Sequence, residues 1–489
     1  MVEDTPVNTG VAVWPDPVSA AAAVRRMQLK LHRWAGEDSS RRFGDLFNLV
    51  YDPAFLMHAW QRVSDNTGAR TPGVDRATVA SIVTRIGVAN FLDDLRKQLK
   101  FRTFRPVEVR QVMIPKASGK LRKLGIPTVA DRVVQAVLKL VLEPIFEVDF
   151  QSSSYGFRPN RRAQDAIAEI QYLTTRGYTW VFEADIAACF DTIDHVALMD
   201  RLRVRVSDKD VLALVKAFLK AGVMTTTGDR EQSLTGTPQG GILSPLLANI
   251  ALSALDDHFD RQWRTEMGTA YQRGRRRRNG QGCWRLIRYA DDFVIVVSGE
   301  REHAEALRGQ VAELLAPLGL TLSLEKTHVV GIDDGIDFLG FHIRRMRKRG
   351  TTKSYVYTVP ARKAIAAVRA KVSAATYRST LHQDLDEILT RLNQILRGWA
   401  NYFRHGVSKA VFGSLDSHAW RRLGSWIRRK HARISWSQIR RRFCDQGWRF
   451  AHNGVVFTGA SSVAVSRYRY RGNRIPTPWT PTLTPATSG

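Results

Sequence analysis

Two adjacent carboxylates stand between two apolar runs in the segment RLIRYADDFVIVVSGE, residues 285–300. Runs rich in β-branched and aromatic residues on both sides of a short polar break predict two strands of a hairpin, with Asp291 and Asp292 at or beside the turn. Neighbouring aspartates are also ordinary turn residues. The pair could bind a metal ion, but such a site needs further ligands from elsewhere in the chain.

A second acidic segment, VFEADIAACFDTIDH at residues 181–195, offers such ligands. Its apolar start predicts a strand that ends at Asp185, while Asp191 and Asp194 have an equal local claim to a metal. Carboxylate oxygens suit hard divalent cations, and two such ions can clamp the attacking and leaving oxygens of a phosphoryl transfer. Asp185 could instead cap a helix or join an ion pair. The candidate metal ligands are therefore Asp185, Asp291 and Asp292.

The composition indicates a polyanionic partner. The chain has 489 residues, enough for two or three packed units. Lys and Arg number 74 against 46 Asp and Glu, a formal net charge of +28, which is typical of nucleic-acid binding, although a merely soluble basic surface would give the same excess. Three scattered cysteines exclude a disulfide framework and a cysteine zinc site. No export signal or membrane-spanning apolar run is found.

The surrounding patterns predict the elements that position the carboxylates. Helices are predicted at 21–35, within 43–66, at 130–150 with an end near Pro144, at 208–222, in the later part of 235–263 and at 303–320. Strands are predicted at 109–127 around a glycine turn, at the start of 178–193, in 285–300 and in SLEKTHVVG and DFLGFHIRR. A basic insertion at 271–284 precedes the hairpin, and helices dense in Arg, Lys and Trp follow Pro360. The first 20 residues and the Pro/Thr-rich end are expected to be unfolded.

Several segments, taken in order, resemble the sequence blocks of a reverse transcriptase of the group II intron type. These segments are IPKASGKLRKLGIPTVADRVVQAVLKLVLEPIFE, SYGFRPNRRAQDAI, FEADIAACFDTIDH, TGTPQGGILSPLLANIAL, RYADDFVI, LSLEKT and DFLGFHI. The stretch from 392 to 431 resembles the maturase, or thumb, domain of those proteins. The resemblance covers about residues 45–450.

The resemblance implies a fold of the α/β (α+β) class, a right-hand polymerase with fingers and palm, followed by an all-α thumb/maturase domain and a small basic C-terminal region. The implied divisions are an N-terminal extension at 1–40, fingers and palm at 41–350, thumb/maturase domain at 351–436, a basic DNA-binding-like region at 437–475 and a disordered tail at 476–489. Many relatives end in a His/Cys nuclease module. With three cysteines, we expect no such HNH module and no target-strand cutting by this polypeptide.

The resemblance also assigns roles residue by residue. Asp185, Asp291 and Asp292 take the catalytic, metal-binding positions for two Mg²⁺ ions, for which Mn²⁺ could substitute. The implied contacts to the incoming deoxynucleoside triphosphate (dNTP) are Lys116, Arg122, Phe190, Gln239, Gly240 and Lys326. Phe190 matches the residue that stacks under the sugar and blocks a 2′-OH; the alternative is a plain core phenylalanine. Lys326 would act as general acid to pyrophosphate, or only as a phosphate neighbour.

The other dNTP contacts have structural alternatives as well. Lys116 and Arg122 match fingers residues that hold the triphosphate through a point charge and a donor fork; otherwise they are solvated surface charges. Lys123 stands where the family usually has proline, which we expect to loosen a turn and leave Arg122 in place. Gln239 and Gly240 lie in a loop whose glycines allow a close backbone approach, and the same loop leads into a helix.

Basic residues supply the predicted nucleic-acid surface. Arginines interleave with tryptophans after residue 390, a pattern typical of helices that pack by aromatic faces while basic faces meet a phosphate backbone. The predicted nucleic-acid contacts are Arg158, Arg275, Arg276, Arg277, Arg278, Arg421, Arg422, Arg428, Arg429 and Lys430. Their binding should weaken strongly with added salt.

The predicted activity is RNA-directed DNA polymerisation, in which a primer 3′-OH attacks the α-phosphate of a dNTP. The implied partners are a group II intron RNA held as a ribonucleoprotein, an RNA template, a DNA primer, target DNA and dNTPs, with no membrane. Splicing assistance and intron mobility follow from the same resemblance. Two alternatives stay open: a domesticated enzyme of host DNA repair or phage defence, and a non-polymerising RNA-binding splicing factor. The expected location is the bacterial cytoplasm, with nucleoid association through nucleic acid.

Overall fold

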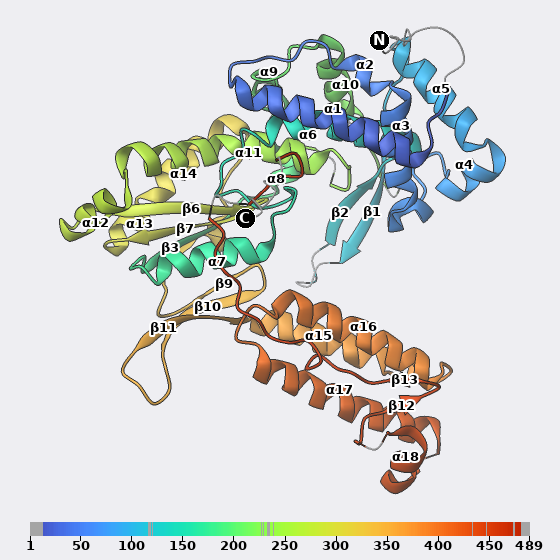
Figure 1. Ribbon diagram of the computed structural model, residues 1–489, viewed down its shortest axis with the longest axis vertical. Helices are drawn as coiled ribbons and strands as arrows, with labels where there is room; N and C mark the ends of the chain where they lie inside the picture. The colour runs from blue at the N-terminus through green and yellow to red at the C-terminus, as the bar shows by residue number, and fades with distance from the viewer. Residues whose placement is uncertain are drawn as a thin grey trace, which may run out of the picture.

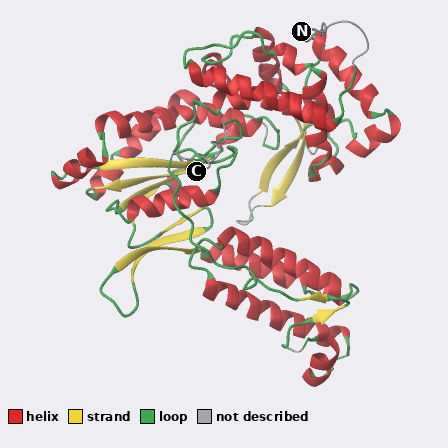
Figure 2. Ribbon diagram, viewed as in Figure 1, coloured by secondary structure: helices red, strands yellow, loops and turns green. Residues whose placement is uncertain are grey.

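The computed structural model describes residues 13–480, apart from 116–118, 120, 226, 228, 232–234, 238, 433, 446, 473 and 474. Three parts follow one another along the chain (Figure 1). Helical fingers come first, a sheet with helices on both faces forms the palm, and long helices form the thumb. Figure 2 shows that strands gather in the middle of the molecule while helices dominate both ends. The predicted order of fingers, palm and helical thumb is confirmed.

The fingers consist of helices packed around one buried helix, together with a hairpin. The helices are α1 (Pro17–Glu37), α2 (Phe47–Val50), α3 (Pro53–Ser64), α4 (Val79–Arg85), α5 (Val88–Lys100) and α6 (Val129–Phe146). Asp52 accepts hydrogen bonds from the first N–H groups of α3, so the predicted helical stretch 43–66 is divided in two. The predicted strand pair is β1 (Val109–Pro115) and β2 (Leu121–Ile126), extended by β4 (Val223–Met224) and β5 (Arg230–Glu231).

Helix α6 runs through Pro144, which corrects the prediction that the helix ends there. A proline inside a helix leaves the carbonyl four residues earlier without its usual partner. Here the Leu140 carbonyl accepts a hydrogen bond of 2.8 Å from Gln28 Nε2 of α1. A contact from a distant segment thus repairs the helix, and no local pattern could have shown it.

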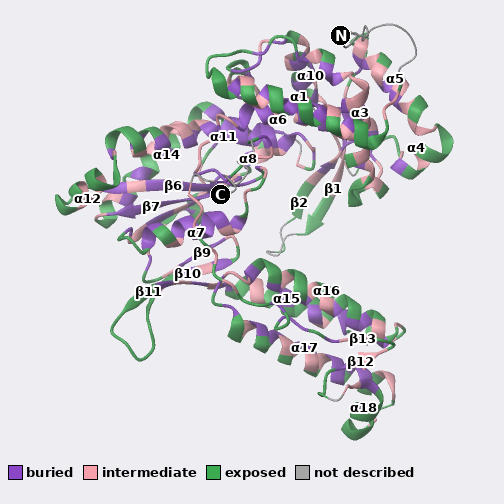
Figure 3. Ribbon diagram, in the orientation of Figure 1, coloured by how far each residue is buried: buried purple, intermediate pink, exposed green. Residues whose placement is uncertain are grey.

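The palm sheet has the strand order β6-β7-β3-β8 and is antiparallel throughout. Its strands are β6 (Cys283–Tyr289), β7 (Asp292–Ser298), β3 (Trp180–Asp185) and β8 (His328–Gly331). Alternate residues of β7 face two different cores: Phe293 and Ile295 pack with the fingers-side core, whereas Val294 and Val296 pack with the core shared with the thumb. Because both faces are buried, this strand is a continuous apolar run (Figure 3).

Helices cover both faces of the palm sheet: α7 (Ala163–Thr174) packs on one face, and α11 (Ser244–Arg261), α13 (Arg301–Glu305) and α14 (Leu307–Leu315) pack on the other. The short helix α8 (Cys189–Thr192) follows β3, α9 (His195–Arg203) and α10 (Lys209–Lys220) lie beside the fingers helices, and α12 (Ala270–Arg278) precedes β6. The basic insertion forms α12, because Thr269 and Gln272 make a reciprocal capping box at its start. No helix in the described part of the chain is long and apolar enough to span a bilayer.

A second sheet joins the palm to the thumb. Its strands β9 (Ile336–Phe338), β10 (Phe341–Arg347) and β11 (Ser354–Pro360) pair in the order β11-β10-β9. The thumb follows with α15 (Arg362–Ala375), α16 (Leu385–Phe403), α17 (Lys409–Lys430), α18 (Trp436–Phe443) and the small hairpin β12 (Ala451–His452) and β13 (Val455–Val456). The apolar stripes of α16 and α17 face each other in its core.

The described part of the chain after β13 returns to the palm, which corrects two expectations. Residues 457–472 leave the thumb and pass along α7, and residues 475–480 reach α1 (Figures 1 and 2). Trp479 is 5 % exposed, and its Nε1 donates to Gln28 Oε1 at 3.2 Å. The region predicted as one basic unit at 437–475 is therefore split between thumb and palm, and the described start of the predicted tail is packed.

Candidate active site

The three candidate carboxylates come together at one edge of the palm sheet. Asp185 is the last residue of β3, and the strand register places it opposite Asp292, the first residue of β7. Ala290 and Asp291 form the two-residue turn of the β6–β7 hairpin, in which Tyr289 pairs with Asp292. The φ of +60° at Ala290 falls at the first turn position, as in type II′ turns.

Burial and neighbouring charge raise the pKa values of Asp291 and Asp292. Desolvation raises the pKa of Asp291 above its ordinary value, and the Asp185 charge adds to the effect, while Arg122 opposes it. The Asp292 side chain reaches solvent, yet the surrounding protein still desolvates its carboxylate, and together with Asp291 and Asp185 this raises its pKa to about 6. Three anions held this close are costly without a cation, so the donor set suits a hard divalent ion.

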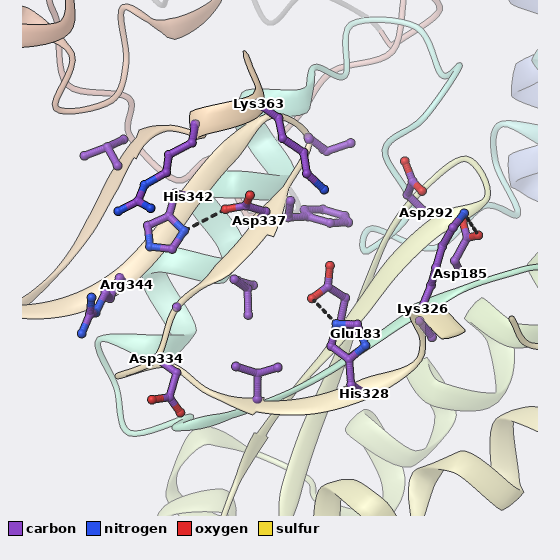
Figure 4. A pocket seen from close by; sticks show the side chains of 18 of the residues that line it. Glu183, Asp185, Asp292, Lys326, His328, Asp334, Asp337, His342, Arg344 and Lys363 are labelled. Atoms are coloured by element: carbon purple, nitrogen blue, oxygen red, sulfur yellow. Dashed lines mark hydrogen bonds and ion pairs between the residues drawn. The ribbon is translucent and has the colours of Figure 1, made fainter. Parts of the chain in front are cut away.

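Lys326 supplies a positive charge to this edge. Its Nζ lies 2.6 Å from Asp185 Oδ2 (Figure 4), and this hydrogen bond raises the pKa of the lysine. The alternative prediction of an ion pair for Asp185 thus applies in this conformation. Within the residues that the structure describes, no three His, Cys, Asp or Glu side chains are already arranged around a metal position. A metal ion here would have to displace the lysine.

A buried arginine holds the turn from beneath. Arg288 of β6 is 0 % exposed, and its guanidinium donates to Asp256 Oδ1 and Oδ2 at 2.8 and 2.5 Å and to the Ala290 carbonyl at 2.8 Å. Gly156 packs on the same turn: a Cβ there would lie 2.2 Å from the Ala290 nitrogen. The sequence analysis missed Arg288 and Asp256, although a charge within an otherwise apolar strand was a usable signal.

Arg158 is part of this support and is not placed to contact nucleic acid. Its guanidinium is buried, donating to Glu147 at 2.8 to 3.1 Å and to the carbonyls of Gln151 and Ser154 at 2.6 and 2.8 Å. All of these partners lie in the loop that leads to Gly156. The prediction of a nucleic-acid contact is therefore replaced by a structural role.

Phe190 lies at the mouth of the site on the short helix α8. It is half-buried, and its ring meets that of Phe157 edge to face at 6.5 Å. Phe157 is 50 % exposed with a φ of +57°, an unfavourable conformation for a bulky residue that often marks a functional position. Phe190 packs against the fingers-side core, as the alternative of a core phenylalanine expects, and its contact with a sugar stays a prediction.

The loop before α11 lies against α8 and β2. Gln239 Nε2 donates to an Asp191 carboxylate oxygen at 3.3 Å, and the Gln239 carbonyl accepts from Gly125 N at 2.7 Å. Gly240 has a φ of +116°, and a Cβ there would lie 2.5 Å from the Gly125 carbonyl. The close approach that requires this glycine is thus to β2. Asp194, one of the two alternative metal candidates, accepts a hydrogen bond from Ala197 N and caps α9. Asp191, the other alternative, lies beside Gln239.

The basic fingers residues can be placed only in part. Arg122 is exposed on β2 and close enough to stabilise the charge of Asp291. Lys116 lies outside the described residues. Lys123 pairs with Met113 inside β2, so the turn that we expected to be loosened is regular strand, and Arg122 keeps its place opposite Ile114.

A cleft of about 1010 Å³ extends from the carboxylate edge toward the second sheet. Its walls include Asp185, Asp292 and Lys326 on one side and His342 and Lys363 on the other (Figure 4). Basic and acidic groups face each other across the opening. The cleft therefore gives a charged substrate access to the carboxylates from the thumb side.

The predicted nucleic-acid residues divide into exposed and internally bonded sets. Arg275 and Arg278 of α12 and Arg421, Arg428 and Arg429 of α17 are exposed. By contrast, Arg276 and Arg277 bond to the Gly282 and Arg176 carbonyls, Arg422 to Thr376, and Lys430 to Gln383. Figure 1 places α12 at the end of β6 opposite the catalytic turn, away from the carboxylate edge.

Comparisons with known proteins identify the class. Residues 114–343 match the family described as reverse transcriptase (RNA-dependent DNA polymerase), and residues 365–444 match the group II intron maturase-specific domain. The chain is 38 % identical over 361 residues to protein YkfC of Escherichia coli, covering 70 % of this chain and 93 % of that one. It is 30 % identical over 434 residues to the group II intron-encoded protein LtrA of Lactococcus lactis, covering 75 % and 71 %.

The chain belongs to the group II intron-encoded reverse transcriptases that carry a maturase domain, a family of RNA-directed DNA polymerases. A putative COX1/OXI3 intron 1 protein of Saccharomyces cerevisiae is 27 % identical over 61 % of this chain and 39 % of that protein. Among solved structures, a telomerase of Candida albicans in complex with a telomeric RNA fragment overlaps 73 % of this chain and 68 % of that one, at 12 % identity and a TM-score of 0.39. An overlap that low carries no inference.

Proposed function

We propose that the chain copies RNA into DNA by two-metal nucleotidyl transfer at the carboxylate edge. The observation that carries this proposal is the convergence of Asp185, Asp291 and Asp292 at one end of the palm sheet, where their charges destabilise one another. Two Mg²⁺ ions, or Mn²⁺ in their place, would be held there. Bound metal would activate the primer 3′-OH and neutralise the charge that develops on the transferred phosphate.

The residues around the carboxylates have complementary tasks in this proposal. Arg122 would hold the triphosphate with its donor fork, and Lys326, released from Asp185 when metal binds, would neutralise charge on the leaving pyrophosphate. A lysine ammonium is protonated at neutral pH, so the released Lys326 would carry a proton that it could donate. Phe190, backed by Phe157, would exclude a ribose 2′-OH, and Gln239 would line the base pair being formed.

We further propose that the thumb holds structured nucleic acid beside the cleft. The exposed Arg421, Arg428 and Arg429 give α17 a basic end. The group II intron maturase domain that includes them points to intron RNA as a partner, with splicing assistance as a second activity. Target DNA would meet the arginines of α18 (Trp436–Phe443), whose last turn contains Arg440, Arg441 and Arg442.

The direct test is primer extension on an RNA template with dNTPs and Mg²⁺. The parent protein should make cDNA, and Asp291→Ala with Asp292→Ala should make none while retaining RNA binding. The identity of the RNA partner is tested separately, by sequencing the RNA that co-purifies with the protein. A lariat intron would support the intron partner, whereas polymerase activity with no intron RNA would favour a domesticated enzyme. Absence of cDNA from the parent protein would favour the splicing-factor alternative.

A further inference from the structure

The described residues 457–472 and 475–480, here called the C-terminal strap, bind the thumb at their start. Thr458 N donates to Asn393 Oδ1 of α16 at 2.9 Å, and Ser461 N donates to Asp416 Oδ2 of α17 at 2.9 Å. Gly459 has a φ of +68°, and a Cβ there would lie 2.5 Å from the Asp416 carboxylate. The strap therefore joins both long thumb helices before it leaves them.

The strap then crosses α7 of the palm with alternating side chains. Tyr468 donates to Asp165 Oδ1 at 2.9 Å, Tyr470 donates to Glu169 Oε1 at 3.1 Å, and the Arg471 guanidinium reaches Asp165 Oδ2 at 2.7 Å. The intervening arginines of the strap point to solvent. This two-residue period is that of an extended chain laid on a surface.

Two buried carboxylates on α7 accept hydrogen bonds from the strap. Asp165 and Glu169 are each 2 % exposed, and a buried carboxylate is costly unless it is paired and hydrogen-bonded. Among the described residues outside the strap, Asp165 accepts from the backbone N–H of Arg162 at 2.9 Å. Asp165 therefore receives its cationic partner, Arg471, from the strap, whereas Glu169 receives one of several partners from it.

Glu169 connects the strap to the catalytic hairpin. Its Oε1 also accepts from Arg285 of β6 at 3.3 Å, and its Oε2 accepts from the Tyr155 hydroxyl at 2.6 Å. The Tyr155 backbone N–H in turn donates to the Arg288 carbonyl at 2.8 Å. One carboxylate is therefore shared by the strap, by the hairpin that carries the YADD turn, and by the loop that supports it.

The far end of the strap is fixed to the fingers. Trp479 packs against His32 with ring centroids 5.6 Å apart and bonds to Gln28, and the Pro478 carbonyl accepts from Arg25 at 2.7 Å. The strap therefore contacts thumb, palm and fingers in turn. The direct covalent link from β11 to α15, by contrast, is the single residue Ala361.

We propose that the C-terminal strap is an internal brace that holds the thumb against the palm, with Tyr470 and Arg471 as positioning residues for extended synthesis. The inference rests on the proposed polymerase function. The thumb already packs on the palm and the second sheet through a shared apolar core and through hydrogen bonds of Tyr402 with Leu339 and Gln164. The strap adds a second, polar attachment at α7, which forms intramolecularly at high effective concentration and further restricts movement of the thumb about Ala361. A thumb held in place keeps the product duplex beside the carboxylates between successive additions.

The test is primer extension in the presence of a trap that captures every enzyme molecule that dissociates. Tyr470→Phe and Arg471→Ala should shorten the cDNA made per binding event by about fivefold or more, with the first nucleotide added at the parent rate. Val465→Ala, at an exposed position of the same strap, is the matched control and should give parent-length products. Equal product lengths for the parent and both variants, with the strap loosened in hydrogen exchange, would overturn the proposal.

A double-mutant cycle and a rescue separate the brace from general stability. If the ion pair between Asp165 and Arg471 carries the effect, Asp165→Asn combined with Arg471→Ala should shorten the cDNA products no more than either change alone. A chain ending at residue 456 should regain long products when a peptide of residues 457–480 is added, but not when that peptide carries the Tyr470→Phe and Arg471→Ala changes. No rescue by the unaltered peptide, in a truncated chain that still adds single nucleotides, would count against the brace. Absence of synthesis in the parent protein would instead sink the proposed function itself.

Discussion

The β6–β7 hairpin carries charged residues on two sides, the side that faces the cleft and the buried side beneath the turn. The two sides differ in how completely the charges are neutralised. At the cleft, Lys326 bonds to Asp185, and the pKa values of Asp291 and Asp292 are raised by burial and by the neighbouring carboxylates. Beneath the turn, Arg288 and Asp256 are wholly buried and paired through two short hydrogen bonds. Arg288 and Asp256 neutralise each other and hold the hairpin in place, whereas at the cleft three carboxylates have one lysine among them. The comparison separates the carboxylates that could bind a cation from the carboxylate that supports the fold.

The largest effect expected is on the cleft side. Asp291→Ala, or Asp292→Ala, should reduce cDNA synthesis by roughly three orders of magnitude or more, because the metals would lose a ligand at the reacting phosphate. Primer extension with Mg²⁺ measures this loss. RNA binding, followed by filter retention, should change little, and Asp194→Ala, which removes only a helix cap, should keep most synthesis. Undiminished synthesis in the first two variants would disprove the site.

A change beneath the turn should lower the free energy of unfolding. Arg288→Ala leaves Asp256 buried without its cation, and breaking such a pair costs about 3 to 5 kcal/mol of unfolding free energy. Denaturant unfolding followed by circular dichroism measures it. Arg301→Ala removes an exposed pair with Glu305 and serves as the control, with an expected change within about 0.5 kcal/mol. Similar losses in both variants would erase the distinction between the two sides.

Asp131 is a buried carboxylate that bonds to a hydroxyl group, whereas Asp256 pairs with an arginine. The pH dependence of unfolding should distinguish these two ways of burying a carboxylate. Burial raises the pKa of Asp131 to about 6, although its hydrogen bond to Thr128 opposes the shift. Between pH 3.8 and 6 the folded chain binds more protons at this group than the unfolded chain, so its contribution to stability falls as pH rises through that window. The full loss is about 3 kcal/mol at most. Unfolding measured from pH 4 to 7 should show a flatter profile in Asp131→Asn.

The aromatic pair at the cleft should affect selectivity more than rate. Phe190→Ala opens space at the sugar, and incorporation of ribonucleotides relative to deoxynucleotides should rise about tenfold to a hundredfold. Single-nucleotide insertion with each triphosphate measures the ratio. Phe157→Ala, which removes the edge contact and keeps the Phe190 ring, should give a smaller rise in the same direction. An unchanged ratio for Phe190→Ala would show that the residue only packs.

The smallest effects are expected for the thumb arginines. Replacing Arg421, Arg428 and Arg429 by alanine should lower the slope of log affinity for RNA against log salt by about 2 to 3. Arg422→Ala should leave that slope unchanged and lower thumb stability by about 1 to 2 kcal/mol, because its guanidinium bonds to Thr376. Binding titrations at several salt concentrations distinguish the two. Equal slopes in both variants would remove the proposed basic surface.

Local patterns predicted much of the fold. The hairpin of residues 285–300 followed from two apolar runs around a polar break, and the strand ending at Asp185 followed from the same reasoning. Both rest on near neighbours in the chain. The helix through Pro144 and the packed Trp479 were mispredicted, because each is stabilised by Gln28, more than a hundred residues away along the chain.

The sequence by itself determined the class of chemistry through an ordered series of blocks that resembles a reverse transcriptase, because each block keeps its residues contiguous in the chain, whereas a single short motif left the alternatives open. The tertiary structure decided which charges are free to act. Arg158 and Arg428 look alike in the sequence, yet one is enclosed by Glu147 and backbone carbonyls and the other is exposed. Burial and partners depend on segments brought together by folding, so only the folded chain separates an arginine of the scaffold from one that can reach nucleic acid.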